Sequence, residues 1–268
     1  MIGAIIGDII GSAYEFDPVK TKDFPLWTHK TYVTDDSIMT VAVGKALLRN
    51  HLQGDDLYNA MVEEMRTFGR RHPDGGYGLS FRRWLYCENP QPYNSFGNGS
   101  AMRVSACAYA AKTLEQALAL AEISALVSHN HPEGIKGAQA AAAAVFMART
   151  GASKAEIRKY IDRHFYPLTQ TLDEIRPNYY FNEICQDTVP QAIISFLESE
   201  NYEDSIRNAV SLGGDADTLA AITGAIAWAY YGRNGKTPDM VKLEEIVRTW
   251  YLTEDLLQVV DQFRETFC

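Results

Sequence analysis

A six-residue stretch, Gly213 to Thr218, constrains this chain more than any other because it places two carboxylates and a hydroxyl directly before an apolar segment. Successive side chains on an α-helix are rotated by about 100°, so Asp215 and Asp217 cannot share one face of a helix. We therefore expect the two glycines to form a turn. A helix that begins at Thr218 then lets both acids converge at its N-terminus.

A second stretch, made of Thr34, Asp35 and Asp36, has the same composition and also leads into helical periodicity. Neither stretch contains Lys or Arg. If the two meet, their four carboxylates must either gain protons or recruit cations. Such hard oxygen ligands suit Mg²⁺ or Mn²⁺ better than Zn²⁺, and paired ions lie about 3.5–4 Å apart. The simpler interpretation is that each stretch only caps a helix, but two copies favour metal.

Composition and charge limit the class of protein. The chain has 268 residues, 46% of them hydrophobic, and a net charge of −9, which indicates a globular protein with one domain over residues 1–268. The acidic balance argues against nucleic acid as a partner, except as a modified substrate. The apolar run at residues 1–10 is interrupted by Asp8 and lacks basic residues, so neither a signal peptide nor a membrane span is expected and the cytoplasm is the expected location. The four cysteines show no CxxC spacing, which disfavours structural zinc, disulfides and a catalytic cysteine.

Helical periodicity covers most of the chain, and no alternation of period two is long enough for a sheet. The predicted fold class is therefore all-α, a compact bundle of about ten to twelve helices. Helices are expected at 2–14, 36–47, 55–72, 80–85, from 105 as a long alanine-rich helix, at 114–127, after 132, after 153, and at 189–198, 202–212, 218–231, 240–251 and 254–267. Residues 166–186 show no pattern that assigns them.

The first predicted helix carries Gly3, Gly7 and Gly11 four positions apart. Because glycine weakens a helix, this spacing indicates close packing against another backbone. Asp8 and Glu15 are seven positions apart and are expected on a common face. Buried acids there require a metal, water or hydrogen bonds.

Residues Gly97 to Ser100 form a glycine-rich loop that precedes the predicted alanine-rich helix. Backbone N–H groups at such a helix N-terminus favour an anionic phosphate, although a plain flexible loop is the alternative. His129 and His131 raise the question of zinc, but no further Cys or His has a matching spacing. We therefore expect His129 to contact a ligand or to orient a helix.

Five motifs in order resemble the motif series of the ADP-ribosylglycohydrolase family, whose members hydrolyse ADP-ribosylated acceptors. They are Gly7-Asp8 with Gly11 and Glu15, Thr34-Asp35-Asp36, Gly97 to Arg103, Ser128-His129 with Pro132-Glu133-Gly134, and Gly213 to Thr218. The resemblance implies a monomeric orthogonal all-α bundle with two Mg²⁺ ions, or Mn²⁺ in their place, in a cleft. It also implies cleavage of the bond between the distal ribose of ADP-ribose and an acceptor.

The resemblance further implies roles for individual residues. The implied metal ligands are Thr34, Asp35, Asp36, Asp215, Asp217 and Thr218. The implied substrate-binding residues are Gly97, Asn98, Gly99, Ser100, Met102 and His129. Glu15 matches an acidic position near the metals with a catalytic or gating role, and Asp36 is the second candidate for the general base. Residues 73–84 are expected at the acceptor end of the cleft.

Several alternatives remain open from the sequence. Glycosidic cleavage passes through an oxocarbenium-like state, which a metal-assisted site or an ordinary pair of carboxylates can stabilise. A catalytically silent ADP-ribose-binding or structural relative is disfavoured because all four Asp and Glu15 are present. A prenyl-transferring enzyme would need an acid where Met39 stands. The acceptor stays open: arginine, serine, another side chain, a nucleic-acid end or a small ADP-ribose conjugate.

Overall fold

The computed structural model describes residues 1–49 and 53–268, and within them every regular element is helical. The bounds are α1 (Ile2–Ser12), α2 (Asp35–Leu47), α3 (Gly54–Arg71), α4 (Leu79–Tyr86), the short 3-10 helix η1 (Asn98–Ser100), α5 (Ser105–Ala110), α6 (Leu114–Leu126), α7 (Pro132–Arg149), α8 (Lys154–His164), α9 (Leu172–Ile175), α10 (Cys185–Leu197), α11 (Tyr202–Val210), α12 (Ala216–Tyr231), α13 (Pro238–Trp250) and α14 (Glu254–Phe267). The all-α prediction is confirmed, and the described residues form fourteen α-helices where about ten to twelve were expected.

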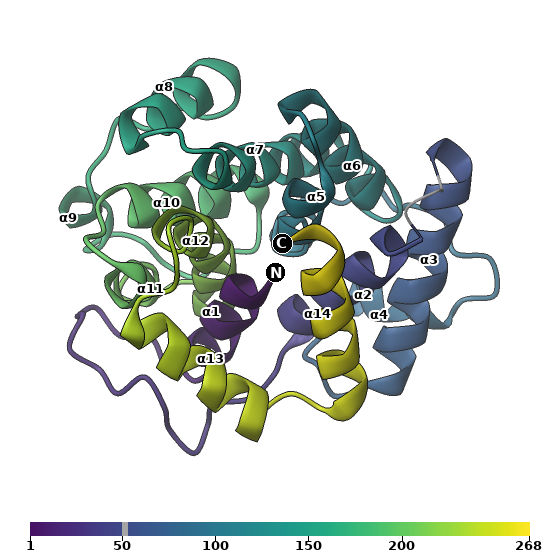
Figure 1. The fold of residues 1–268 in the computed structure, drawn as a ribbon, viewed down its shortest axis with the longest axis horizontal. Helices are drawn as coiled ribbons and strands as arrows, with labels where there is room; N and C mark the ends of the chain where they lie inside the picture. Colours follow the sequence, from purple (N-terminus) through teal and green to yellow (C-terminus); the bar gives the residue numbers. More distant parts are fainter. Residues whose placement is uncertain (50–52) are drawn as a thin grey trace.

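The centre of the fold is the pair α1 and α12, which lie side by side near the middle of the molecule (Figure 1). Every residue of α1 is buried. A Cβ built on Gly7 would lie 2.5 Å from the carbonyl carbon of Ala220, and one built on Gly11 would lie 2.6 Å from Cα of Asp217. The predicted close backbone packing is therefore present, and α12 is the partner.

Other helices surround this pair. Helices α7, α10 and α11 pack against α12, while α2 contacts α1, α3, α5 and α14. The alanine run of α7, at 140–144, is buried, which lets that helix lie close to its neighbours in the crowded interior. Among the described helices, none combines the length and the apolar composition that a passage through a lipid bilayer demands.

Six predicted boundaries were wrong by two residues or more. Helix α11 ends at Val210 rather than residue 212, and α13 begins at Pro238 rather than residue 240. The other four have local reasons. Helix α1 ends at Ser12 rather than residue 14, so Glu15 lies in the following loop. Helix α12 begins at Ala216, two residues early, because the Asp215 carbonyl accepts the first hydrogen bond of the helix, from the Leu219 N–H over 2.9 Å. Helix α10 begins at Cys185 rather than residue 189. Pro190 therefore lies inside the helix, which continues through it. The expected long alanine-rich helix is α5, six residues long, because Thr113 caps a new helix immediately afterwards.

Candidate metal and ligand site

The starts of α2 and α12 lie beside each other and bring the two acidic stretches together. Thr34 is the N-cap residue of α2, and its side chain accepts a hydrogen bond from the backbone N–H of Asp36. Thr218 Oγ1 donates to Asp36 Oδ2 over 3.2 Å, across the junction of the two helices. The acids near residue 35 and those near residue 216 are therefore neighbours in space.

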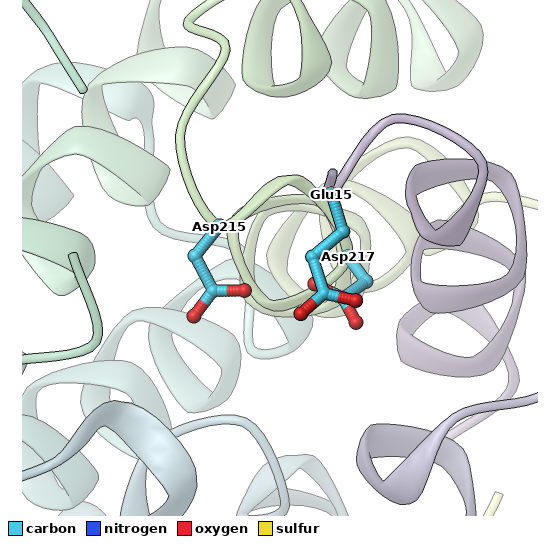
Figure 2. A group of neighbouring side chains, drawn as sticks. All are labelled: Glu15, Asp215 and Asp217. Carbon is cyan, nitrogen blue, oxygen red and sulfur yellow. The ribbon is translucent and has the colours of Figure 1, made fainter. Parts of the chain in front are cut away.

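Three carboxylates converge at this junction. Oxygen atoms of Glu15, Asp215 and Asp217 all lie within 4.8 Å of one another. Figure 2 shows the three side chains, with Glu15 on the loop after α1 and the two Asp residues at the start of α12. Such a group of oxygen atoms, drawn from separate segments, is an arrangement that can hold a hard divalent cation.

The acids line a cavity of about 650 Å³ that also contains the glycine-rich loop. Of the site residues predicted from sequence, those in its wall are Glu15, Asp35, Asp36, Gly97, Asn98, Gly99, Met102, His129, Asp215, Asp217 and Thr218. Thr34 and Ser100 do not line it. Thr34 Oγ1 donates to Asp8 Oδ1 over 2.6 Å, and Ser100 Oγ donates to the Gly134 carbonyl over 2.7 Å.

Asp8 lies behind the acidic cluster, fully buried. It accepts hydrogen bonds from the hydroxyl of Thr34, from the Ser37 backbone N–H over 3.1 Å and from the Ser37 hydroxyl. Burial and the charge of Asp217 nevertheless raise the pKa of Asp8 to about 7. These hydrogen bonds are one of the kinds of partner expected for a buried acid at this position.

The electrostatics of the cavity favour a cation. Burial, followed by the charge of Asp217, raises the pKa values of Asp35, Asp36 and Asp215 well above their ordinary range. The same two causes raise the pKa of Glu15 to about 8. Crowded carboxylates with such pKa values are relieved when a cation replaces their protons.

The donor set fits a divalent metal. Oδ1 of Asp36 is buried and has no hydrogen-bond partner among the described residues, so it has a free lone pair to offer. Among the described residues of the cavity wall, Arg103 is the one cationic side chain. Carboxylate and hydroxyl oxygens without imidazole or thiolate suit Mg²⁺ or Mn²⁺.

The glycine-rich loop is attached directly to the acids. Asn98 Nδ2 donates to Asp215 Oδ2 over 2.7 Å and to Thr188 Oγ1 over 3.1 Å. A Cβ built on Gly99 would lie 3.2 Å from His129 Nε2, so the loop passes close to the imidazole edge. The loop contains η1 and is not followed directly by a long helix. Its Gly97 and Asn98 N–H groups already donate to Ser95 Oγ and the Glu183 carbonyl, so among the described residues the N–H groups of Gly99 and Ser100 are the ones left to bind an anion.

The two histidines of the predicted motif have different positions. His129 is 5% exposed and lines the cavity, with its Nδ1 2.8 Å from Ser128 Oγ. His131 instead caps α7 by accepting from the Glu133 N–H over 3.1 Å. Burial and Arg103 lower the pKa of His129 well below its ordinary value, so the ring is neutral at pH 7.

Two residues of the cavity wall, Tyr93 and Glu183, were not predicted from the sequence. Tyr77 and Phe81, which also line the cavity, belong to residues 73–84, the segment expected at the acceptor end. Glu183 falls in the unassigned residues 166–186, where α9 is too short to produce a periodic pattern. Its one sequence signal was an acid two positions before α10.

Comparison with known proteins agrees with this geometry. The profile of the family described as ADP-ribosylglycohydrolase matches residues 1–267. Human ADP-ribosylhydrolase ARH3 is 26% identical over 312 aligned positions, covering 87% of this chain and 84% of that protein. ADP-ribosylarginine hydrolase Tri1 from Pseudomonas putida (strain GB-1) is 26% identical over 275 positions, covering 90% of this chain and 72% of that protein.

The fold is shared with a solved structure described as an ADP-ribosylglycohydrolase-related protein complex, which superposes with a TM-score of 0.74 at 22% identity and covers 100% of this chain and 96% of its own. The family profile spans nearly the whole chain, including both acidic stretches and the glycine-rich loop. The protein therefore belongs to the ADP-ribosylglycohydrolase family.

Proposed function

We propose that this protein is a metal-dependent hydrolase that releases ADP-ribose from a modified acceptor by cleaving the bond at the anomeric carbon of the distal ribose. The observation that carries the proposal is that the acids of two helix starts and the glycine-rich loop share one cavity. In this proposal the loop's N–H groups without a protein partner, those of Gly99 and Ser100, are donors for an anionic diphosphate, and the acids lie where a cation and a sugar would meet.

The metal-holding residues are proposed to be Asp35, Asp36, Asp215, Asp217 and Thr218, all of which line the cavity. Thr34 remains a sixth candidate, because its hydroxyl has one lone pair beyond its bonds to Asp8 and Asp36. When bound there, two Mg²⁺ or Mn²⁺ ions would supply Lewis-acid chemistry, orienting ribose hydroxyls and making water a better nucleophile.

The substrate-holding residues are proposed to be Gly97, Asn98, Gly99, Met102 and His129. Ser100 has an indirect role in this proposal, since its hydroxyl holds the Gly134 carbonyl and so shapes the loop from behind. Binding the diphosphate away from the reacting carbon would provide positioning energy that places the ribose against the acids.

Glu15 and Asp36 are the proposed proton acceptors. In the hydrolysis, a water oxygen forms a bond to the anomeric carbon while the bond from that carbon to the acceptor atom breaks. The water proton goes to one of these carboxylates and then returns to the departing acceptor group, so no further reactant is needed. Glu15 is partly exposed and comes from a loop, which gives it access to the water side of the cleft.

The names of two relatives indicate what to test first. Tri1 is named an ADP-ribosylarginine hydrolase, and ARH3 an ADP-ribosylhydrolase. The name of Tri1 makes arginine-linked ADP-ribose the first substrate to test, and the serine-linked and small O-acyl substrates that the sequence left open are tested beside it.

The test is to incubate the protein with each substrate in Mg²⁺ or Mn²⁺ and to quantify released ADP-ribose. Wild type should release it from at least one linkage, and chelator should abolish the release. Asp217→Asn should lose the activity, whereas Glu245→Gln, which changes an exposed acid on α13, should retain it. ADP-ribose binding without release from any linkage would identify a silent binding protein instead.

A further inference from the structure

Arg103 is an unusual cation for the wall of an acidic cavity. It is 1% exposed, and among the described residues its hydrogen bonds go to Ser124 and Ser128 rather than to a carboxylate. Its guanidinium also lies 5.8 Å from the ring centre of Phe81. Burying a cation without an acidic partner destabilises a fold by several kcal/mol unless its donors are satisfied. The position of Arg103 therefore calls for an account beyond packing.

The hydrogen bonds of Arg103 lead directly to His129. Arg103 Nη2 donates to Ser128 Oγ over 3.0 Å, and Ser128 Oγ lies 2.8 Å from His129 Nδ1. A guanidinium has no acceptor atoms, so Ser128 must accept from it. The serine hydroxyl then has its own proton to donate and one lone pair left.

That proton decides the tautomer of the imidazole. If Nδ1 of His129 carried a hydrogen, Ser128 would accept twice and its buried proton would need another acceptor. The group beside Ser128 that could serve is the phenol of Tyr93, whose ring centre lies 5.8 Å from that of His129. If Ser128 instead donates to Nδ1, all three groups are satisfied by the contacts observed, which favours this arrangement.

The tautomer matters because of where Nε2 lies. A Cβ built on Gly97 or Gly99 would be 3.5 Å or 3.2 Å from that nitrogen, so Nε2 faces the backbone of the glycine-rich loop. With a hydrogen, Nε2 adds a donor beside the N–H groups of the loop. Without one, its lone pair would repel the oxygen atoms of an anion held there.

We propose that Arg103 is a positioning residue, which acts through Ser128 to keep His129 in the tautomer with hydrogen on Nε2 and so makes it a donor to a phosphate group in the glycine-rich loop. The assignment of a phosphate to this loop rests on the proposed function. The tautomer itself depends only on the hydrogen bonds of the protein.

The direct test is nitrogen NMR of the histidine side chains in the metal-free protein, with the His129 signals assigned by their loss in His129→Gln. Wild type should show the hydrogen on Nε2. Ser128→Ala should shift the signals toward a mixture of tautomers, and Ser128→Thr, which keeps a hydroxyl, should restore the wild-type pattern. A wild-type spectrum with hydrogen on Nδ1, or an unchanged spectrum in Ser128→Ala, would overturn the proposal.

Two further variants test whether the tautomer of His129 depends on the hydrogen bonds from Arg103 through Ser128, rather than on any change in the cavity wall. Ser124→Ala removes a hydroxyl that contacts Arg103 but not His129, so the tautomer should not change. Tyr93→Phe removes the competing phenol and should also leave the tautomer unchanged. A shift of tautomer in Tyr93→Phe would contradict the proposed path of the serine proton. Thermal unfolding of each variant confirms that it is folded before its spectrum is interpreted.

Calorimetric titration with ADP-ribose then measures the consequence for binding. Ser128→Ala should bind about tenfold more weakly, the value expected when one hydrogen bond to a charged group is lost. Ser128→Thr and Ser124→Ala should bind within about twofold of wild type. Unchanged affinity in a variant with altered tautomer would refute the donor role. If wild type fails to bind ADP-ribose, the proposed function fails, while the NMR result still decides the tautomer.

Discussion

Thr218 Oγ1 lies 3.2 Å from Asp36 Oδ2, and this hydrogen bond joins the starts of α12 and α2 over a sequence separation of 182 residues. The contact places a hydroxyl between two groups of acids that would otherwise meet with only repulsion. Because Asp36 Oδ1 has no partner among the described residues, the same carboxylate keeps one oxygen for a cation.

The first prediction concerns the crowded charge. Asp217→Asn should stabilise the metal-free protein, because it removes the charge that acts on Asp8, Asp35 and Asp36. We expect a gain of about 1 kcal/mol, or a rise in Tm of about 2–4 °C for a chain of this size. The same change should weaken Mg²⁺ binding at least about tenfold.

Calorimetry with and without Mg²⁺ measures both effects of Asp217→Asn. Glu245→Gln is the matched control, since that exposed acid on α13 should leave both quantities unchanged. A lower Tm for metal-free Asp217→Asn would show that repulsion does not dominate at the cluster.

The second prediction concerns pH. The pKa of Asp8 is raised from 3.8 to about 7, and that of Glu15 from 4.5 to about 8. The folded state therefore holds protons that the unfolded chain has already released, so this contribution to stability is full below about pH 4 and is lost as the pH rises toward 8. Tm measured in chelator should fall from pH 5 to pH 8.

Added Mg²⁺ should raise Tm more at pH 8 than at pH 5, because a cation competes with the same protons. Differential scanning calorimetry at three pH values, with chelator or Mg²⁺, provides the comparison. A metal effect that is equal at all three values would count against protonated acids in the cluster.

The third prediction concerns the seam between α1 and α12. Gly11→Ala would place a Cβ 2.6 Å from Cα of Asp217, so the start of α12 must move. We expect a loss of about 1–3 kcal/mol in unfolding free energy. Weaker Mg²⁺ binding should accompany it, since Asp217 moves with the backbone.

Gly78→Ala is the control for Gly11→Ala, because nothing lies within 4 Å of a Cβ built at Gly78. Chemical denaturation and metal titration of both variants test the prediction. If Gly11→Ala is destabilised but binds Mg²⁺ with unchanged affinity, the packing of α1 against α12 does not determine the metal site.

The fourth prediction concerns the loop that supports the turn before α12. Lys20 Nζ donates to the Arg176 carbonyl over 2.9 Å and to the carbonyls of Tyr179 and Leu212. Lys20→Met should remove these bonds, lower stability by about 1 kcal/mol and weaken metal binding a few-fold, because the Gly213 turn follows Leu212.

Lys22→Met changes a lysine of the same loop that pairs with Asp204 at the surface, so its effect should be about 0–1 kcal/mol, with metal affinity unchanged. Isothermal titration with Mg²⁺ compares the two variants. If Lys20→Met and Lys22→Met lose metal affinity equally, the cause is the lost positive charge of the loop rather than the hydrogen bonds of Lys20 to backbone carbonyls.

Periodicity predicted the fold well because most helices here bury one face. The α1 glycines pointed to a close backbone partner, and α12 is that partner. Helix ends were less predictable, since the periodic pattern does not mark them. Helix α12 begins at Ala216 although the Asp215 side chain makes no capping hydrogen bond, and Pro190 fits within α10 although proline usually ends a helix.

The parts of the candidate site that are marked by residue type could be predicted from the sequence. The parts that depend on tertiary packing could not. The sequence pointed to both acidic stretches. The burial of Arg103 was not visible in it, because a charged residue gives no signal of being enclosed. Glu183 was missed for a different reason: it reaches the cavity from residues 166–186, whose position depends on tertiary contacts rather than on local pattern.

The hydrogen bond from Asn98 Nδ2 to Asp215 Oδ2 has a thermodynamic consequence. It joins the glycine-rich loop, the proposed diphosphate site, to Asp215, a proposed metal ligand, so we expect an occupant of one site to change the affinity of the other. Linkage requires that this influence be reciprocal: the factor by which Mg²⁺ changes the affinity for ADP-ribose must equal the factor by which ADP-ribose changes the affinity for Mg²⁺.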